Sequence, residues 1–248
     1  MRKLWFAVVL LVLTSSFALA SANQYILIQN YPWGTNSPNE TNMTQAVGSY
    51  TEYDFSVNAA TIFNSTCCFA MIEGGDGTQT AWENFLTNNS ATILNWVNNG
   101  GALLVQSAGW NYGSTFTFAD GTFNLGNTLY PSGTLKAAGV AAFTLQPISP
   151  NQSGNYIAHD TISGAGLTVF MTEDANGNPI VAGEKYGKGY IMYSGLTTSQ
   201  WHFAGYGLTT DMIAYTADQG ACPEPGTLVM LGTGLVGLAG ILRRKLKL

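Results

Sequence analysis

A run of strand, helix and strand in the middle of the chain constrains its fold most strongly. Residues 67–73 (CCFAMIE) form a continuous apolar segment that ends at Gly-Gly-Asp-Gly, which is typical of a buried strand followed by a turn. Residues 80–98 place large apolar side chains at helical spacing and stop at Gly100-Gly101, where a left-handed helix cap is favourable. Residues 102–106 (ALLVQ) are again a buried strand. Such a unit predicts parallel strands joined by a crossover helix, as in doubly wound α/β domains.

Further apolar segments extend this unit into a three-layer α/β domain with one mostly parallel sheet. Residues 24–30 (QYILIQN) are expected to form another buried strand. The turn KYGK at 185–188 joins two strands as a hairpin and predicts an antiparallel extension of the sheet. The other predicted elements are strands over 51–56, 167–173, 179–186 and 189–195, a loop or small hairpins over 111–139, and a helix over 207–217.

The start of the chain has the layout of a signal peptide. Arg2 and Lys3 precede the apolar run 4–13, and the small-residue sequence Ala-Leu-Ala-Ser-Ala follows at 18–22. The run is shorter than the roughly 20 residues that cross a bilayer, which disfavours a permanent anchor. We therefore expect signal peptidase to remove residues 1–22, with cleavage after Ala20 or Ala22.

The end of the chain combines a proline-flanked acid, an apolar segment and a basic cluster. Residues 226–242 contain no charge and number 17, so as a helix they rise about 25 Å and make a marginal single transmembrane span. The cations after residue 242 are expected to stay on the cytoplasmic side, which leaves the body of the chain outside the inner membrane. Glycines at 232, 234, 237 and 240 also permit close helix contact, so a dimerising anchor is the alternative to a recognition tag.

This tail resembles the PEP-CTERM sorting signal of Gram-negative bacteria that make exopolysaccharide. Its elements are Pro223, Glu224 and Pro225, the apolar span, and Arg243 with Arg244. The resemblance implies that an exosortase, a membrane-embedded cysteine protease, processes the chain near the motif. The two prolines keep this region extended, so that a protease can bind it as a strand. We interpret 219–248 as the sorting tail and 23–218 as the folded body.

The charge of the body excludes one class of partner. Of the 9 basic residues only Lys136, Lys185 and Lys188 lie between the two apolar runs 4–13 and 226–242, whereas all 14 acidic residues do. Nucleic acid is therefore not an expected partner, because phosphate binding needs cationic contacts. Few charges and many Asn, Thr, Ser and Gly suit an extracellular surface, while abundant aromatic and β-branched residues indicate a packed core.

The cysteines and histidines indicate neither a cofactor nor a metal site. A bridge between the neighbours Cys67 and Cys68 would be strained, and their spacing fits no zinc pattern. We expect buried thiols, and a link from either of them to Cys222 in an oxidising compartment is the alternative. The chain has two histidines and neither His-x-x-x-His nor Cys-x-x-Cys spacing.

The body resembles the class I glutamine amidotransferase-like superfamily, in particular its ThuA-like relatives. The segments NWVNNGGALLVQSAG, NYIAHDTISG and EKYGKGYIMYSG carry this resemblance over about 24–217. It implies a flavodoxin-like, amidotransferase-like sheet order and places Ser107 where the family has its cysteine nucleophile. His202 takes the place of the family's histidine, but Ala204 replaces its glutamate and Val105 the glycine before the nucleophile. A histidine without a carboxylate partner is a poor base, which disfavours catalysis.

Two further groups of residues are candidates for binding. His159 either lines the cleft or is a turn histidine bonded to Asp160 or to the backbone. Glu73 and Asp76 follow a central strand at the end where open α/β sheets bind ligands. They are candidates for calcium or sugar hydroxyls, with a solvated turn as the alternative. The tryptophans expected to stack on a sugar in the same crevice are Trp33 and Trp110.

Three functions follow from these patterns. The favoured one is an exported surface or matrix protein of biofilm type, noncatalytic and associated with exopolysaccharide or the cell envelope. The second is a secreted hydrolase that uses Ser107 with His202 or His159. The third is a carbohydrate-binding module that uses Trp33, Glu73, Asp76 and Trp110.

Overall fold

The computed structural model describes residues 24–30, 38–64, 66–109, 113–126, 128–197 and 206–221. One compact unit spans Gln24–Cys222. The predicted signal peptide, the span 226–242 and the sorting-motif residues lie outside the described ranges, as do Trp33, Trp110 and His202. None of the helices within those ranges is long and apolar enough to cross a membrane.

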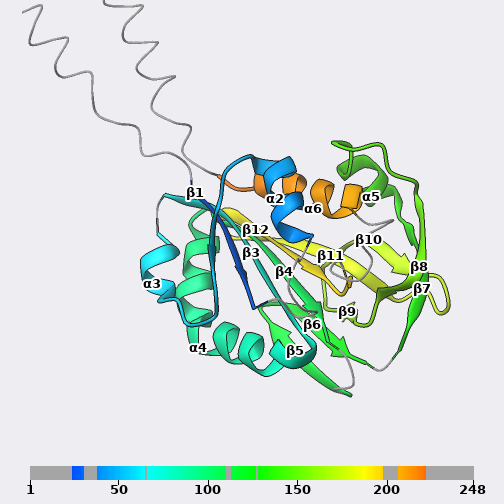
Figure 1. The fold of residues 1–248 in the computed structure, drawn as a ribbon, viewed down its shortest axis with the longest axis horizontal. Helices are drawn as coiled ribbons and strands as arrows, with labels where there is room; N and C mark the ends of the chain where they lie inside the picture. Colours follow the sequence, from blue (N-terminus) through cyan, green and yellow to red (C-terminus); the bar gives the residue numbers. More distant parts are fainter. Residues whose placement is uncertain are drawn as a thin grey trace, which may run out of the picture. The chain divides into compact units, whose positions relative to one another are not determined.

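A nine-stranded sheet forms the centre of this unit (Figure 1). Its strands are β1 (Gln24–Gln29), β2 (Thr51–Tyr53), β3 (Cys67–Gly75), β4 (Ala102–Ala108), β7 (Tyr130–Leu135), β8 (Asn151–Ala158), β10 (Thr168–Glu173), β11 (Pro179–Tyr186) and β12 (Gly189–Ser194). They lie in the order β2-β1-β3-β4-β12-β11-β10-β7-β8. Neighbours are parallel from β2 to β12 and antiparallel from β12 to β8.

The sheet is therefore mixed, and the prediction of a mostly parallel sheet was wrong in its proportions. The expected hairpin β11–β12 and its neighbour β10 are present. They are extended by β7 and β8, which pair antiparallel at the far edge. The segment 130–135 contains a proline and a glycine, and 151–158 has few apolar residues, so neither has the alternation of a half-buried strand.

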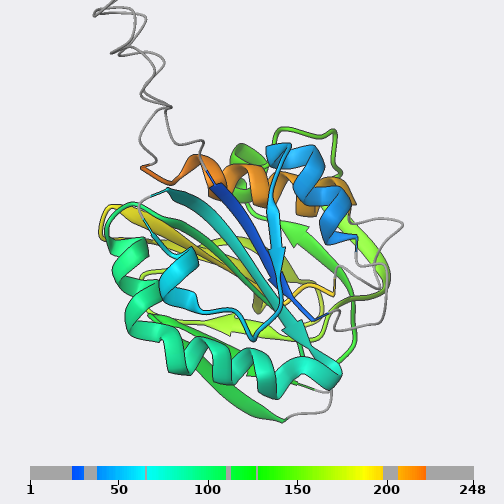
Figure 2. The same cartoon turned by 60° about the vertical axis from the view of Figure 1, so that its left-hand side comes forward.

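Helices and a small second sheet cover the two faces of the large sheet (Figures 1 and 2). On one face, α2 (Asn39–Val47), α5 (Ala137–Ala142) and α6 (Tyr206–Asp218) surround an apolar core. On the other face lie α3 (Ala59–Ile62) and α4 (Gln79–Asn98). That second core also contains residues of the three-stranded sheet β5-β6-β9, which consists of β5 (Ser114–Phe118), β6 (Gly121–Leu125) and β9 (Thr161–Ser163).

Helix α4 begins one residue before the predicted segment and ends where predicted. Its apolar stripe is buried against β3 and β4, and Gly100 closes it with a φ of 120°, which favours glycine. The indole Nε1 of Trp96 donates a 2.9 Å hydrogen bond to the carbonyl oxygen of Cys67. Burying each large apolar side chain of this kind contributes about 1.5–3 kcal/mol, so the packing of α4 on the sheet contributes strongly to the stability of the body.

Candidate functional site at the carboxyl edge of the sheet

The strand order identifies where a ligand would bind. From β1 the chain passes to β2 on one side, and β3 then lies on the other side of β1. The two connecting segments contain α2 and α3, which belong to opposite cores. In open α/β sheets, ligands bind outside the carboxyl ends of the strands at such a topological switch point. The candidate site is therefore at the ends of β1 and β3.

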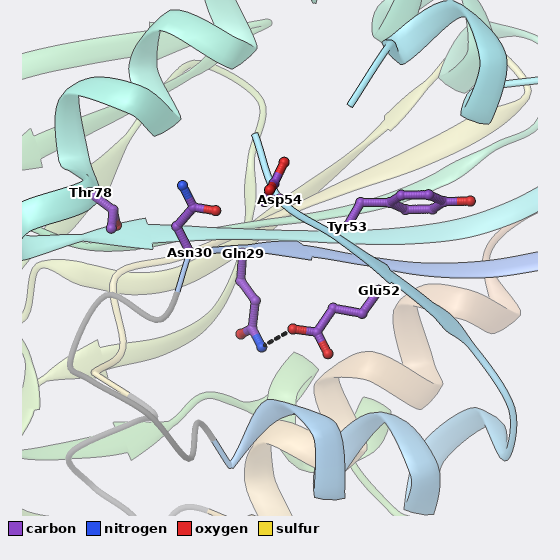
Figure 3. A pocket seen from close by; sticks show the side chains of 6 residues that line it. All are labelled: Gln29, Asn30, Glu52, Tyr53, Asp54 and Thr78. Atoms are coloured by element: carbon purple, nitrogen blue, oxygen red, sulfur yellow. Dashed lines mark hydrogen bonds between the residues drawn. The ribbon is translucent and has the colours of Figure 1, made fainter. Parts of the chain in front are cut away.

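A pocket of about 600 Å³ opens at this place (Figure 3). Its volume lies within the range of roughly 300–1,000 Å³ that is usual for small-molecule sites. The lining is polar, with two carboxylates, two amides and one aromatic ring. The lining residues are Gln29, Asn30, Glu52, Tyr53, Asp54 and Thr78.

Gln29 connects the acidic groups beside this pocket. Its Nε2 donates hydrogen bonds to Glu52 Oε1 at 3.0 Å, drawn in Figure 3, and to Glu40 Oε1 at 3.1 Å. Burial, and to a lesser extent the charge of Glu52, raise the pKa of Glu40. Hydrogen bonds from the Ser56 side chain and backbone lower the pKa of the exposed Asp54. The pocket therefore keeps a negative charge at neutral pH.

A buried polar network lies behind the pocket. Gln29 Oε1 accepts a 2.9 Å hydrogen bond from Asn39 Nδ2, which also donates to Glu73 Oε2. The other oxygen of Glu73 accepts a 2.7 Å hydrogen bond from Gln106 Nε2. All four side chains are buried, and amide donors of this kind offset the cost of burying a carboxylate.

The predicted ligand residues thus occupy different places. Glu73 is fully buried and accepts hydrogen bonds within the network behind the pocket. It is not among the residues that line the pocket. Asp76 begins the short 3₁₀ turn Asp76–Thr78, of which Thr78 lines the pocket. Sequence reasoning missed Glu52 and Asp54, although both follow the start of a predicted strand at the same edge of the sheet. Among the described residues, no three His, Cys, Asp or Glu side chains form a group that could hold a metal ion.

A second buried carboxyl group lies at the end of β4. Ser107 Oγ donates a 2.7 Å hydrogen bond to Asp160 Oδ2, and Gly109 N donates to the same oxygen at 2.9 Å. Gly126 N donates to Asp160 Oδ1 at 3.1 Å. Burial raises the pKa of Asp160 to about 7, and the three donors oppose this rise. Asp160 thereby joins the end of β4 to the segments that follow β6 and β8.

Among the described residues, the hydroxyl of Ser107 is hydrogen-bonded to a carboxyl group and a backbone amide rather than to a histidine. The side chains of Ser107 and Asp160 are both fully buried. His159 Nδ1 lies 3.3 Å from the carbonyl oxygen of Thr128, and burial lowers the pKa of His159. The partner that the structure gives Ser107 is therefore Asp160, which sequence reasoning had considered only as a neighbour of His159.

Comparisons with known proteins bear on the tail and on the fold. Residues 221–245 match the family model of the PEP-CTERM protein-sorting motif, which confirms the predicted motif and implies an exported, membrane-anchored precursor with exosortase as its processing partner. No curated protein matches the sequence.

Several solved structures are similar in fold at low sequence identity. A cytoplasmic protein from Salmonella typhimurium LT2 has a TM-score of 0.50 and 12% identity, over 78% of this chain and 99% of that one. A putative GMP synthase component from Thermoplasma acidophilum has a TM-score of 0.49 and 7% identity, over 79% and 94%. A β-galactosidase from Bacillus circulans sp. alkalophilus has a TM-score of 0.47 and 11% identity, over 81% of this chain but only 31% of the enzyme.

At these identities the likeness concerns the fold alone, a mixed α/β arrangement. This chain spans about a third of the length of the β-galactosidases it resembles. The chain therefore carries a PEP-CTERM sorting motif at residues 221–245, following a mixed α/β body.

Proposed function

We propose that this chain is an exported cell-surface or extracellular-matrix protein that an exosortase processes at its tail. The match of residues 221–245 to the PEP-CTERM motif carries this proposal. The signal-peptide layout of residues 1–22 and the cations after the apolar segment 226–242 support the same topology. In it the precursor is anchored in the inner membrane by the tail, with the body outside.

The motif itself provides the first test. Replacing both Arg243 and Arg244 by Gln removes the basic end of the matched range, and we expect the product to keep its tail. Lys247→Gln changes a cation just outside the match, and it should leave trimming as in the wild type. Intact mass of the membrane and secreted fractions measures both outcomes. Equal trimming of all three proteins would contradict a role for the motif in processing.

We infer that the body is a noncatalytic module. Ser107 and Asp160 are buried, and the serine hydroxyl is engaged as a hydrogen-bond donor. A nucleophile must reach its substrate, and a general base must lie next to it. The described surroundings of Ser107 instead support a structural role, in which the Ser107–Asp160 hydrogen bond holds β4 and β8 together.

The pocket at the switch point favours a second function for the body, which is binding of a neutral polyhydroxylated ligand such as a glycan. Carboxylates accept hydrogen bonds from hydroxyl groups, amides both accept and donate them, and Tyr53 supplies an aromatic ring. The negative charge of Glu52 and Asp54 opposes acidic sugars. Association with exopolysaccharide would take place through this pocket.

A further inference from the structure

The two neighbouring cysteines of β3 differ in chemical state. Cys67 has a free, buried thiol that lies 3.7 Å from the carbonyl oxygen of Phe69. Cys68, which is also buried, is disulfide-bonded. The sequence contains three cysteines, so Cys222 is the one cysteine of this chain left to pair with Cys68.

The chain after α6 returns to the start of β3, where Cys68 lies. A side-chain carbon on Gly220 would come within 3.1 Å of the Cys68 carbonyl oxygen and 3.3 Å of Ala102 Cβ. Ala221 N donates a 2.8 Å hydrogen bond to the carbonyl oxygen of Gly100. The backbone is therefore fixed beside β3 and β4 immediately before residue 222. Disulfides join Cα atoms about 4.4–6.8 Å apart, and two residues of chain extend at most about 7 Å, so the pair is within reach.

We infer that Cys68 and Cys222 form a disulfide that fastens the end of the body to its central sheet, directly before the Pro-Glu-Pro motif. The inference rests on the export part of the proposed function, because such bonds persist in oxidising compartments. Each thiol loses one proton and one electron. A thiol oxidase in its disulfide form accepts the two protons and two electrons and becomes a dithiol.

This bond has a mechanical consequence for a protein held by its tail. Without the bond, tension on the tail acts first on α6, the last described element. With it, the tension passes to β3, which is hydrogen-bonded to β1 and β4 on its two sides.

Counting thiols in the full chain from the extracytoplasmic fraction tests the bond without any substitution. After denaturation and alkylation, the unreduced wild type should gain one alkyl group, at Cys67. Reduction before alkylation should raise this number to three. Three alkyl groups without reduction would overturn the inference.

Matched variants identify the partners. Cys67→Ser should keep the bond, whereas Cys68→Ser and Cys222→Ser should each leave two alkylatable thiols without reduction. Both should lower the melting temperature by about 5–15 °C, and the double variant by no more than either one. Loss of the bond in Cys67→Ser with its retention in Cys68→Ser would contradict the pairing.

The intact mass of the alkylated protein reports the disulfide and the trimming of the tail independently, so the two proposals can fail separately. An untrimmed chain that gains two alkyl groups on reduction supports the bond and contradicts processing by exosortase. A trimmed chain with three free thiols supports processing and contradicts the bond.

Discussion

Asp160 accepts hydrogen bonds from Ser107, Gly109 and Gly126 while it is shielded from water. Its position could not be predicted from the sequence, because it depends on where the segment after β8 lies relative to the end of β4. Its three donors come from two segments, 107–109 and the residue after β6, that are distant from it in the chain. Glu73 was predicted at the correct edge of the sheet, since it ends an unmistakably buried strand, but the amides that surround it come from β1, β4 and α2.

The buried Asp160 predicts a pH dependence of stability. Its pKa is about 7 in the folded protein and about 3.9 in an unfolded chain, so the folded state holds the extra proton between these values. The free energy of unfolding should therefore fall as pH rises from about 4 to 7, by up to about 1.4 kcal/mol per pH unit, and then level off. Asp211, whose pKa burial raises to about 6, contributes in the same direction below pH 6.

Urea denaturation between pH 4 and 8 measures this effect. Asp160→Asn should reduce the slope most between about pH 5 and 6, midway between the folded and unfolded pKa values, because the titrating group is gone. Asn88→Ala, at an exposed position without an ionisable group, should keep the wild-type slope. A wild-type stability that rises steadily from pH 4 to 7 would show that Asp160 is not buried as an acid with a raised pKa.

The pocket residues predict a binding preference. Isothermal titration should detect neutral hexose oligosaccharides and show much weaker binding of their uronic-acid counterparts. Asp54→Asn should weaken neutral-sugar binding about tenfold or more, because a hydrogen bond to a charged group contributes roughly 1.5–3 kcal/mol. Asp174→Asn, outside the pocket lining, is the matched control. Tighter binding of uronates than of neutral sugars would count against a glycan site of this charge.

Among the helices and strands, those with a buried apolar pattern were the ones that the sequence predicted correctly. The strands β1, β3, β4, β10, β11 and β12 and the helices α4 and α6 agree with the predicted segments to within a few residues. They are apolar runs or helical stripes that face a core. Helix α2 was missed because its sequence, NETNMTQAV, is mostly polar, and its buried residues are two asparagines and one methionine. Its placement depends on the network and on α6 rather than on its own pattern.

Helix α4 provides a paired test of packing against hydrogen bonding. Trp82 and Trp96 are both buried, but Trp82 Nε1 has no hydrogen-bond partner among the described residues, whereas Trp96 Nε1 donates to Cys67. Each Trp→Phe substitution leaves a cavity, and only Trp96→Phe also removes a hydrogen bond. We expect Trp96→Phe to cost about 1 kcal/mol more than Trp82→Phe. Equal losses in chemical denaturation would show that the Trp96 bond contributes nothing net.

Trp82 itself anchors the small sheet on α4. Its ring centroid lies 4.9 Å from that of Phe116 and 5.3 Å from that of Phe123. Trp82→Ala should therefore destabilise the body by about 3–5 kcal/mol. Glu83→Gln, on the next residue of the same helix, should change stability by much less. A loss below about 1 kcal/mol for Trp82→Ala would contradict the packing of β5 and β6 on α4.

For the whole molecule, the ends of the chain say more about function than the body does. The cations of the precursor are concentrated at the two ends, and the body between them is acidic. A charge distribution of this kind supports transfer of the body across the inner membrane with both basic ends remaining behind. In the proposals above, the body contributes a ligand-binding pocket and is joined to the start of the tail by a disulfide.

Intact mass of the protein made in a host with and without its exosortase tests this account most directly. Both products should lack the signal peptide. The product from the exosortase host should also be shortened near Pro223–Pro225, whereas the other should retain every residue to Leu248. An identical, untrimmed C-terminus in both hosts would contradict the account.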